Sequence, residues 1–118
     1  MIISKKQLFF TEMLLPKKIM VGPYQYGVEL SAGLAADEDS DRQTDFRKET
    51  ISLEPRNSNR RMAQTMFHEI QHTIFELIGE KEACLNEDLV DRNASTWLSV
   101  LINTPGFLEY LVQIRDET

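Results

Sequence analysis

Residues 68–72 read His68-Glu69-Ile70-Gln71-His72, and this HExxH pattern contains both histidines of the 118-residue chain. On a helix, residues four positions apart lie one turn apart on the same side, with about 6 Å between their Cβ atoms. Two imidazoles at this separation can bind one Zn²⁺ at roughly 2.0–2.1 Å each. The glutamate after the first histidine then lies beside the metal, where it can accept a proton from a water molecule. The pattern therefore predicts a helix here and indicates metal-assisted hydrolysis, most often of a peptide bond.

The residues around the motif follow a helical period of apolar side chains. At 100° per residue they form one stripe, which consists of Ala63, Met66, Phe67, Ile70, Ile74 and Leu77. His68 and His72 project from the opposite side, near Thr65 and Glu76. We therefore expect the stripe to pack on the core and the histidines to meet either solvent or a second polar layer. Two ordinary surface histidines are the alternative interpretation.

Composition limits the class of protein. The apolar share of 42% and the charged share of 27% are typical of a globular domain. The net charge of −6 argues against nucleic acid as the main partner, because phosphate binding needs a basic surface. The single cysteine, Cys84, excludes an internal disulfide and fits a reducing compartment. The first residues are too weakly apolar for a signal peptide, and no stretch reaches transmembrane length. We expect a cytoplasmic protein with no membrane partner.

The rest of the chain predicts an α+β domain. Residues 1–16 are an N-terminal extension whose apolar pattern does not distinguish helix from strand, and residues 17–118 form a single domain. Alternating side chains and turn residues predict two hairpins, at about residues 17–31 and 42–54, in a small antiparallel or mixed sheet. Ile51 and Leu53 face the same side of the second hairpin. Three helices follow, at about residues 58–78, 86–103 and 105–114.

Capping residues predict where these helices begin and end. Asn57, Ser58 or Asn59 can cap the first helix, and Gly79 is placed to end it. Thr104-Pro105 suits the N-cap and the first position of the last helix. The apolar side chains expected to pack from that helix are Phe107, Leu108, Leu111 and Ile114.

An acidic run before the second hairpin has the spacing of a calcium-binding loop. Asp37, Asp39 and Asp41 would be its first, third and fifth positions. The sixth position is then Arg42 where an EF-hand needs Gly, and the twelfth is Lys48 where it needs Glu. A solvated loop is therefore the better interpretation.

A catalytic zinc ion takes three protein ligands and keeps one position open. Because the chain has no third histidine, we expect a carboxylate as the third ligand. Glu76 lies one turn further along the same helix and cannot readily complete a tetrahedron. Glu80 and Glu82, in the segment that follows, are alternatives. Cys84 is a weaker candidate, because a lone cysteine is more often a small buried apolar residue.

The predicted helix at residues 86–103 offers a better third ligand. Its apolar stripe is Val90, Ala94, Trp97 and Leu101. Glu87 and Asp91 lie together at the margin of this stripe, and a carboxylate at the edge of a buried face has to be paired or coordinated. We predict Glu87 as the third ligand and Asp91 as the acceptor of the free N–H of a zinc-bound imidazole. The alternative is that Glu87 only favours the helix N-terminus electrostatically.

The order His68-Glu69-x-x-His72 and then Asn86-Glu87-x-x-x-Asp91 resembles the gluzincin arrangement. Over about residues 17–114 the chain is similar to the small ImmA/IrrE-like zincins common in phages and mobile elements. The resemblance implies a minimal zincin-like domain that binds one Zn²⁺ per chain through His68, His72 and Glu87. It implies Glu69 as the base and Asp91 as the residue that orients a ligand. It further implies intracellular proteolysis, sometimes of a repressor partner, although this chain lacks an attached DNA-binding domain and has a short gap between His72 and Glu87.

A peptidase of this type needs further parts. Besides zinc, the tetrahedral oxyanion needs a second donor, for which the candidates are Tyr24, Tyr26 and Tyr110. A protein or peptide substrate is expected to dock as an added strand on an edge at residues 50–54. The competing prediction is a catalytically weak or inactive zincin-like protein that binds a protein regulator and uses zinc structurally; a structural site would not need Glu69. A chain that folds only with another subunit is a third alternative.

Overall fold

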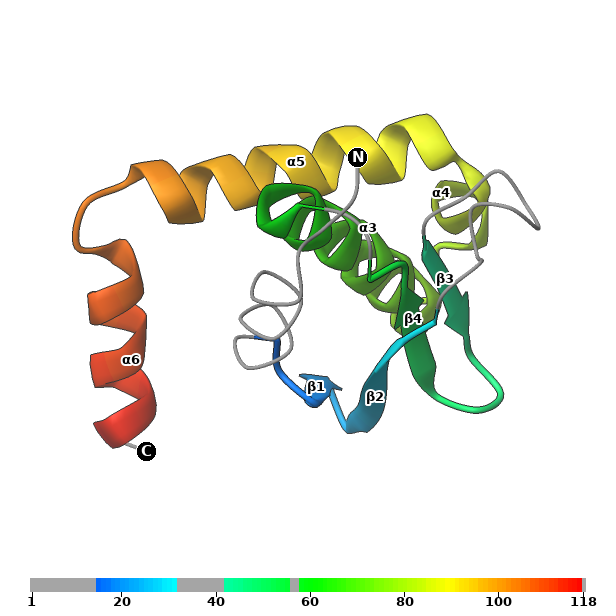
Figure 1. Cartoon of the computed structure of the whole chain (residues 1–118), viewed down its shortest axis with the longest axis horizontal. Helices are drawn as coiled ribbons and strands as arrows, with labels where there is room; N and C mark the ends of the chain where they lie inside the picture. Colours follow the sequence, from blue (N-terminus) through cyan, green and yellow to red (C-terminus); the bar gives the residue numbers. More distant parts are fainter. Residues whose placement is uncertain (1–14, 32–41, 56–57, 118) are drawn as a thin grey trace.

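The computed structural model describes residues 15–31, 42–55 and 58–117. This part of the chain has an α+β fold, with a small mixed sheet followed by helices (Figure 1). The strands are β1 (Lys18–Val21), β2 (Tyr24–Leu30), β3 (Arg42–Asp45) and β4 (Thr50–Leu53). The helices are α3 (Asn59–Leu77), α4 (Lys81–Leu85), α5 (Glu87–Asn103) and α6 (Phe107–Glu117). The predicted fold class is confirmed, and the short helix α4 adds to the three predicted helices.

Both predicted hairpins form. β1 pairs antiparallel with β2, and β3 pairs antiparallel with β4. β2 and β4 are parallel neighbours, which gives the sheet order β1-β2-β4-β3. β4 is therefore an interior strand with partners on both sides. This corrects the prediction that residues 50–54 form the edge available to a substrate, because the edge strand on this side of the sheet is β3.

The core lies between the sheet and α3. Ile51 and Leu53 are fully buried, as expected for alternate residues of β4 that point to the same face. Met62 and Met66 of α3 join them in one cluster with two side chains of the first hairpin. Full burial of a large apolar side chain stabilises the fold by roughly 1.5–3 kcal/mol. This cluster therefore fixes α3 against the sheet.

The predicted ends of α3 are found in the structure. The Ser58 hydroxyl accepts a hydrogen bond from the backbone N–H of Arg61 at 3.2 Å, as an N-cap does. Gly79 follows the C-cap residue with φ at 78°, a left-handed conformation that glycine adopts without strain. These two residues explain why the helix begins and ends where it does.

The start of α6 differs from the prediction. Thr104 is the C-cap of α5, and Gly106, at φ 82°, precedes the first helical residue, Phe107. Pro105 is therefore not the first helical position, because a residue in the left-handed region separates it from the helix. The expected packing of α6 is also not found: none of its residues is buried, and Leu108, Leu111 and Ile114 are all exposed.

The orientation of α3 also corrects a prediction. Within the predicted apolar stripe only Met66 is buried, and the outer members Ile74 and Leu77 are exposed. The buried side of α3 instead includes polar residues, among them Thr65, His68, Glu69, Gln71 and Thr73. Polar groups can be buried when they have hydrogen-bond partners, as Thr65 and Thr73 have in the backbone carbonyls of Met62 and Ile70.

Several predictions lie outside the described residues. These are the character of residues 1–14 and the loop that contains Asp37, Asp39 and Asp41. Within the described ranges, no helix combines the length and the apolar character that crossing a bilayer requires.

Candidate metal centre

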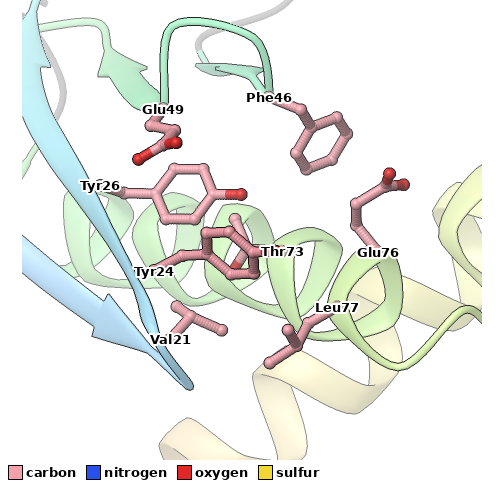
Figure 2. A pocket seen from close by; sticks show the side chains of 8 residues that line it. All are labelled: Val21, Tyr24, Tyr26, Phe46, Glu49, Thr73, Glu76 and Leu77. Atoms are coloured by element: carbon pink, nitrogen blue, oxygen red, sulfur yellow. The ribbon is translucent and has the colours of Figure 1, made fainter.

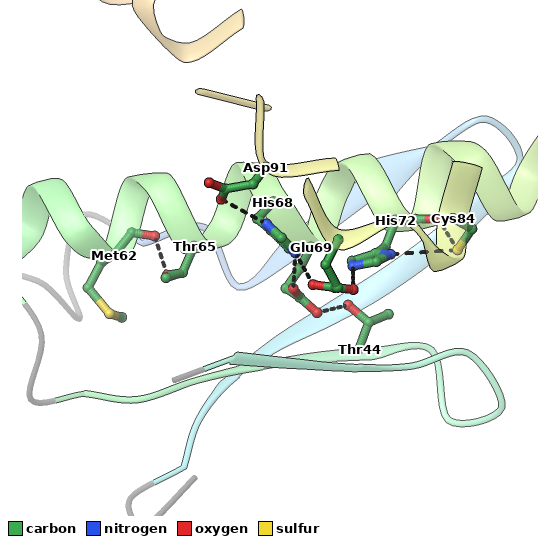
Figure 3. Close-up of polar contacts among 9 residues, drawn as sticks. Thr44, Met62, Thr65, His68, Glu69, His72, Cys84 and Asp91 are labelled. Atoms are coloured by element: carbon green, nitrogen blue, oxygen red, sulfur yellow. Dashed lines mark hydrogen bonds and ion pairs between the residues drawn. The ribbon is translucent and has the colours of Figure 1, made fainter. Parts of the chain in front are cut away.

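α3 carries the motif into the interior of the domain, between the sheet and α5 (Figures 1 and 3). His68 is only 1% exposed and Glu69 is also buried. His72, one turn later, is partly exposed. The two imidazole rings lie edge to face, with centroids 4.9 Å apart. The i, i+4 spacing therefore brings the histidines together, as the sequence predicts for a helix.

Glu87 joins both histidines from the first turn of α5. Its Oε2 lies 2.9 Å from His68 Nε2, and its Oε1 lies 2.8 Å from His72 Nε2. The Asn86 side chain caps this end of α5 by accepting a hydrogen bond from the Leu89 N–H at 3.0 Å. One ligand atom from each of His68, His72 and Glu87 lies within 4.8 Å of the other two. These three residues could therefore hold a metal ion, and we call them the metal cluster.

Asp91 contacts the other nitrogen of His68. Its Oδ1 lies 3.1 Å from His68 Nδ1, one turn of α5 beyond Glu87. A neutral imidazole has a single N–H and cannot donate to Asp91 and Glu87 at once. If Nδ1 donates to Asp91, the lone pair of Nε2 faces the Glu87 carboxylate. This contact becomes favourable when a proton or a cation lies between Nε2 and the carboxylate. A site that attracts a cation in this way meets the electrostatic requirement for binding a metal ion.

Cys84 lies behind His72 and outside the metal cluster. Its Sγ is 3.6 Å from His72 Nδ1 and 3.6 Å from the His72 carbonyl oxygen. Burial raises the pKa of the Cys84 thiol, and the nearby Glu76, Glu87 and Glu69 raise it further. A protonated thiol on the Nδ1 side suits a residue that orients the His72 ring.

Glu69 is held by a residue that the sequence did not point to. The Thr44 hydroxyl, on β3, donates a hydrogen bond of 2.7 Å to Glu69 Oε1 (Figure 3). Glu69 Oε2 lies 3.9 Å from His68 Nε2, beside the ligand nitrogens. No sequence pattern marks Thr44, because the contact depends on how β3 lies against α3.

The other candidate residues are not part of the metal cluster. Glu80 and Glu82 are exposed. Tyr24 and Tyr26 line a cavity beyond the motif, toward the C-terminal end of α3. Tyr110 is exposed on α6. In the described part of the chain, only His68, His72 and Glu87 form a group with metal-ligand geometry.

Comparisons of the chain with protein-family models, curated proteins and solved structures found no match. The resemblance to gluzincins therefore rests on the two motifs alone.

Proposed function

We propose that this chain is a zinc-dependent peptidase that hydrolyses peptide bonds in protein or peptide substrates. One observation carries the proposal. The ligand atoms of the two histidines and Glu87 lie close together, and Thr44 holds Glu69, the residue that follows the first histidine, beside them. A purely structural metal site would use His68, His72 and Glu87 as ligands. It would not require a buried, oriented carboxylate such as Glu69 beside them.

The donor set suits Zn²⁺. Two imidazoles and one carboxylate are the ligands of a common class of catalytic zinc site. Ligand atoms of a tetrahedral zinc lie about 3.4 Å apart, whereas the observed nitrogen to oxygen separations are 2.9 and 2.8 Å. The Glu87 side chain is 66% exposed and can move outward by about half an ångström to meet the ion. Three ligands leave one position open, and we propose one Zn²⁺ per chain.

The surrounding residues would position and move protons. When bound, Zn²⁺ lowers the pKa of a water molecule to about 7 and polarises the scissile carbonyl. Glu69 would accept a proton from the attacking water at Oε2 and later give it to the amide nitrogen as the C–N bond breaks. Asp91 and Cys84 would orient the two imidazoles, and Thr44 would hold the base. The products are a carboxylate and an amine.

β3 would guide the substrate. It is an edge strand of the sheet and carries Thr44 against Glu69. An extended peptide that adds to this edge would pass beside the base and the metal cluster. This proposal replaces residues 50–54 with residues 42–45 as the docking edge.

Metal analysis and one substitution test this function. The purified chain should contain about one Zn²⁺, and Glu69→Gln should retain it while lowering peptide hydrolysis by about 10²–10⁴-fold, the usual contribution of a general base. Glu76→Gln, on the same helix and outside the metal cluster, is the control for stoichiometry. A chain that binds no zinc, or a Glu69→Gln variant with unchanged turnover, would contradict the proposal.

A second candidate function is a binding protein with a structural zinc ion. The support for it comes from another region, between α3, α5 and α6. A cavity of about 420 Å³ between α3, α5 and α6 is lined mainly by apolar side chains, including Phe67, Ile70 and Trp97. Large exposed apolar patches often mark protein contacts. Size-exclusion chromatography with light scattering, on the wild type and on Trp97→Ser, distinguishes the two candidate functions. The binding protein is supported if the chain binds zinc, does not hydrolyse peptides and associates in a way that Trp97→Ser abolishes.

A further inference from the structure

A cavity of about 260 Å³ lies next to the metal cluster, at the C-terminal end of α3. Its walls come from the β1–β2 hairpin, the turn between β3 and β4, and α3 (Figure 2). Pockets for drug-sized ligands begin at roughly 300 Å³. The cavity therefore suits a single side chain better than a larger ligand.

The lining combines aromatic rings with carboxylates. Tyr24, Tyr26 and Phe46 supply three rings, and Glu49 and Glu76 supply two carboxylates at opposite ends of the lining (Figure 2). Among the described residues that line it, none is a lysine or an arginine. Within the described residues, neither carboxylate has a hydrogen bond or salt bridge from its side chain. Aromatic faces and carboxylates both attract cations, so the chemistry of this cavity favours a positive group.

The two glutamates lie close enough to Tyr26, another lining residue, to influence its pKa. Tyr26 is buried, and its pKa is raised first by burial and then by Glu49, Glu76 and Tyr24. The phenol therefore stays neutral near pH 7, and the negative potential comes from the carboxylates. A cation that enters would interact with both glutamates and with the neutral Tyr26 ring.

Two chain segments connect the cavity to the metal cluster. Glu76 follows His72 by four residues, so it lies on the same side of α3, about 6 Å further along the helix axis. Phe46 follows Thr44 by two residues, a distance of at most about 7 Å along the chain. An extended peptide advances about 3.3 Å per residue. A peptide on β3 with its scissile bond at the metal cluster would thus bring a side chain to this cavity within one to three residues.

We infer that the cavity binds a lysine or arginine side chain of the substrate, one to three residues from the scissile bond. This inference rests on the proposed peptidase function and adds a substrate class to it. The methylene stem of the side chain would pack on Tyr24, Tyr26 and Phe46. Its charged head would be attracted by both Glu49 and Glu76 and would form a charge-assisted hydrogen bond with a carboxylate.

Cleavage of a degenerate peptide library by the zinc-loaded full chain tests the inference. The cleaved peptides should be enriched in lysine or arginine at one fixed position. A peptide with lysine there should have a kcat/KM about tenfold above that of its norleucine analogue, which keeps the stem and lacks the charge. The double variant Glu49→Gln/Glu76→Gln should remove this tenfold preference, so that the lysine and norleucine peptides have equal kcat/KM. Glu109→Gln/Glu117→Gln, which removes two charges from exposed α6, should retain it.

A binding measurement separates failure of the inference from failure of the peptidase function. Nα-acetyl-lysine methylamide should shift the ring resonances of Tyr24 and Phe46 at lower concentration than the norleucine analogue, and Glu49→Gln/Glu76→Gln should abolish the difference. Cleavage without any basic preference would overturn the inference and leave the peptidase function standing. Selective lysine binding without any hydrolysis would support the acidic, cation-binding pocket and overturn the peptidase function. Equal shifts by both amides would overturn the pocket.

Discussion

The two sides of α3 contrast in what they bury. The side against β3 and α5 holds polar groups, and His68, Glu69 and Thr73 are almost fully buried there. Two apolar residues near the end of α3 are exposed instead: Ile74, beside α5 and α6, and Leu77, beside the β1–β2 hairpin. Burial on this helix therefore follows the availability of partners more closely than it follows polarity. Buried polar groups cost stability only while they lack partners.

The partners come from three elements. β3 supplies Thr44 to Glu69, α5 supplies Glu87 and Asp91 to the histidines, and α4 supplies Cys84 to His72. α6 offers no comparable set to the apolar side, since none of its residues is buried. The polar side of α3 is thus covered by three elements, whereas the apolar residues Ile74 and Leu77 stay exposed.

The largest effect should come from the core between the sheet and α3. Leu53→Ala removes a fully buried side chain under α3 and should lower the free energy of unfolding by about 2–5 kcal/mol. Trp97→Ala, on the apolar side, should cost less than about 1 kcal/mol, because Trp97 is 54% exposed. Urea denaturation measures both. Equal losses would show that the apolar side is packed in solution, and the contrast would then be wrong.

The next effect is stabilisation by zinc. Because the folded chain gathers the three candidate ligands and the unfolded chain does not, zinc at 100 times its dissociation constant should add about 2.7 kcal/mol to the free energy of unfolding. Thermal unfolding in zinc and in EDTA measures this as a rise in Tm. Glu87→Ala should reduce the response. A Glu87→Ala variant with unchanged zinc affinity would return the third ligand to Glu80 or Glu82.

Local patterns predicted much of this fold. Alternation and turn residues gave both hairpins, and Ser58 and Gly79 marked the ends of α3, because these signals depend on neighbouring residues only. Glu87 and Asp91 were placed at the edge of the α5 stripe by helical spacing, and the structure brings both to His68.

The rest depended on packing between distant segments. The parallel pairing of β2 with β4 joins residues from two hairpins, and it turned the expected edge at residues 50–54 into an interior strand. The rotation of α3 was mispredicted because counting apolar residues gives no weight to polar groups that satisfy one another. Thr44 was missed for the same reason, since its contact joins residues 25 positions apart.

A smaller effect on zinc affinity should distinguish Asp91, which contacts His68, from the nearby Asp88. Asp91→Asn should weaken zinc binding by about 10–100-fold, since an amide orients the His68 imidazole less well than a carboxylate. Asp88→Asn, one residue after Glu87 and largely exposed, should leave the affinity unchanged. Competition with a chromophoric chelator measures both. Equal effects of the two variants would mean that only net charge matters, and that the contact with His68 does not.

Thr44→Val should have a more modest effect. It removes the hydroxyl that donates to Glu69 and keeps the size of the side chain, and a hydrogen bond to a charged group contributes about 1.5 kcal/mol. We expect kcat to fall about tenfold with zinc content unchanged. Thr96→Val, whose hydroxyl donates to a backbone carbonyl on exposed α5, is the matched control. A loss of zinc in Thr44→Val would show that Thr44 supports the metal cluster as a whole.

The smallest effect concerns the thiol behind His72. Burial and the carboxylates of Glu76, Glu87 and Glu69 raise the pKa of Cys84 above the usual 9.0, so the folded chain holds this proton more tightly than the unfolded chain does. The stability that results is fully present below the unfolded pKa and is lost as the pH rises through the folded pKa. In EDTA, the unfolding free energy of the wild type minus that of Cys84→Ala should therefore be constant near pH 7. Above pH 9 this difference should fall, because the wild type loses stability. Urea titrations at several pH values measure it.

The comparison with Cys84→Ala isolates the thiol from Tyr26, whose pKa is raised in the same direction. A change in favour of the wild type would mean that the polar side stabilises a thiolate, which the three nearby carboxylates oppose.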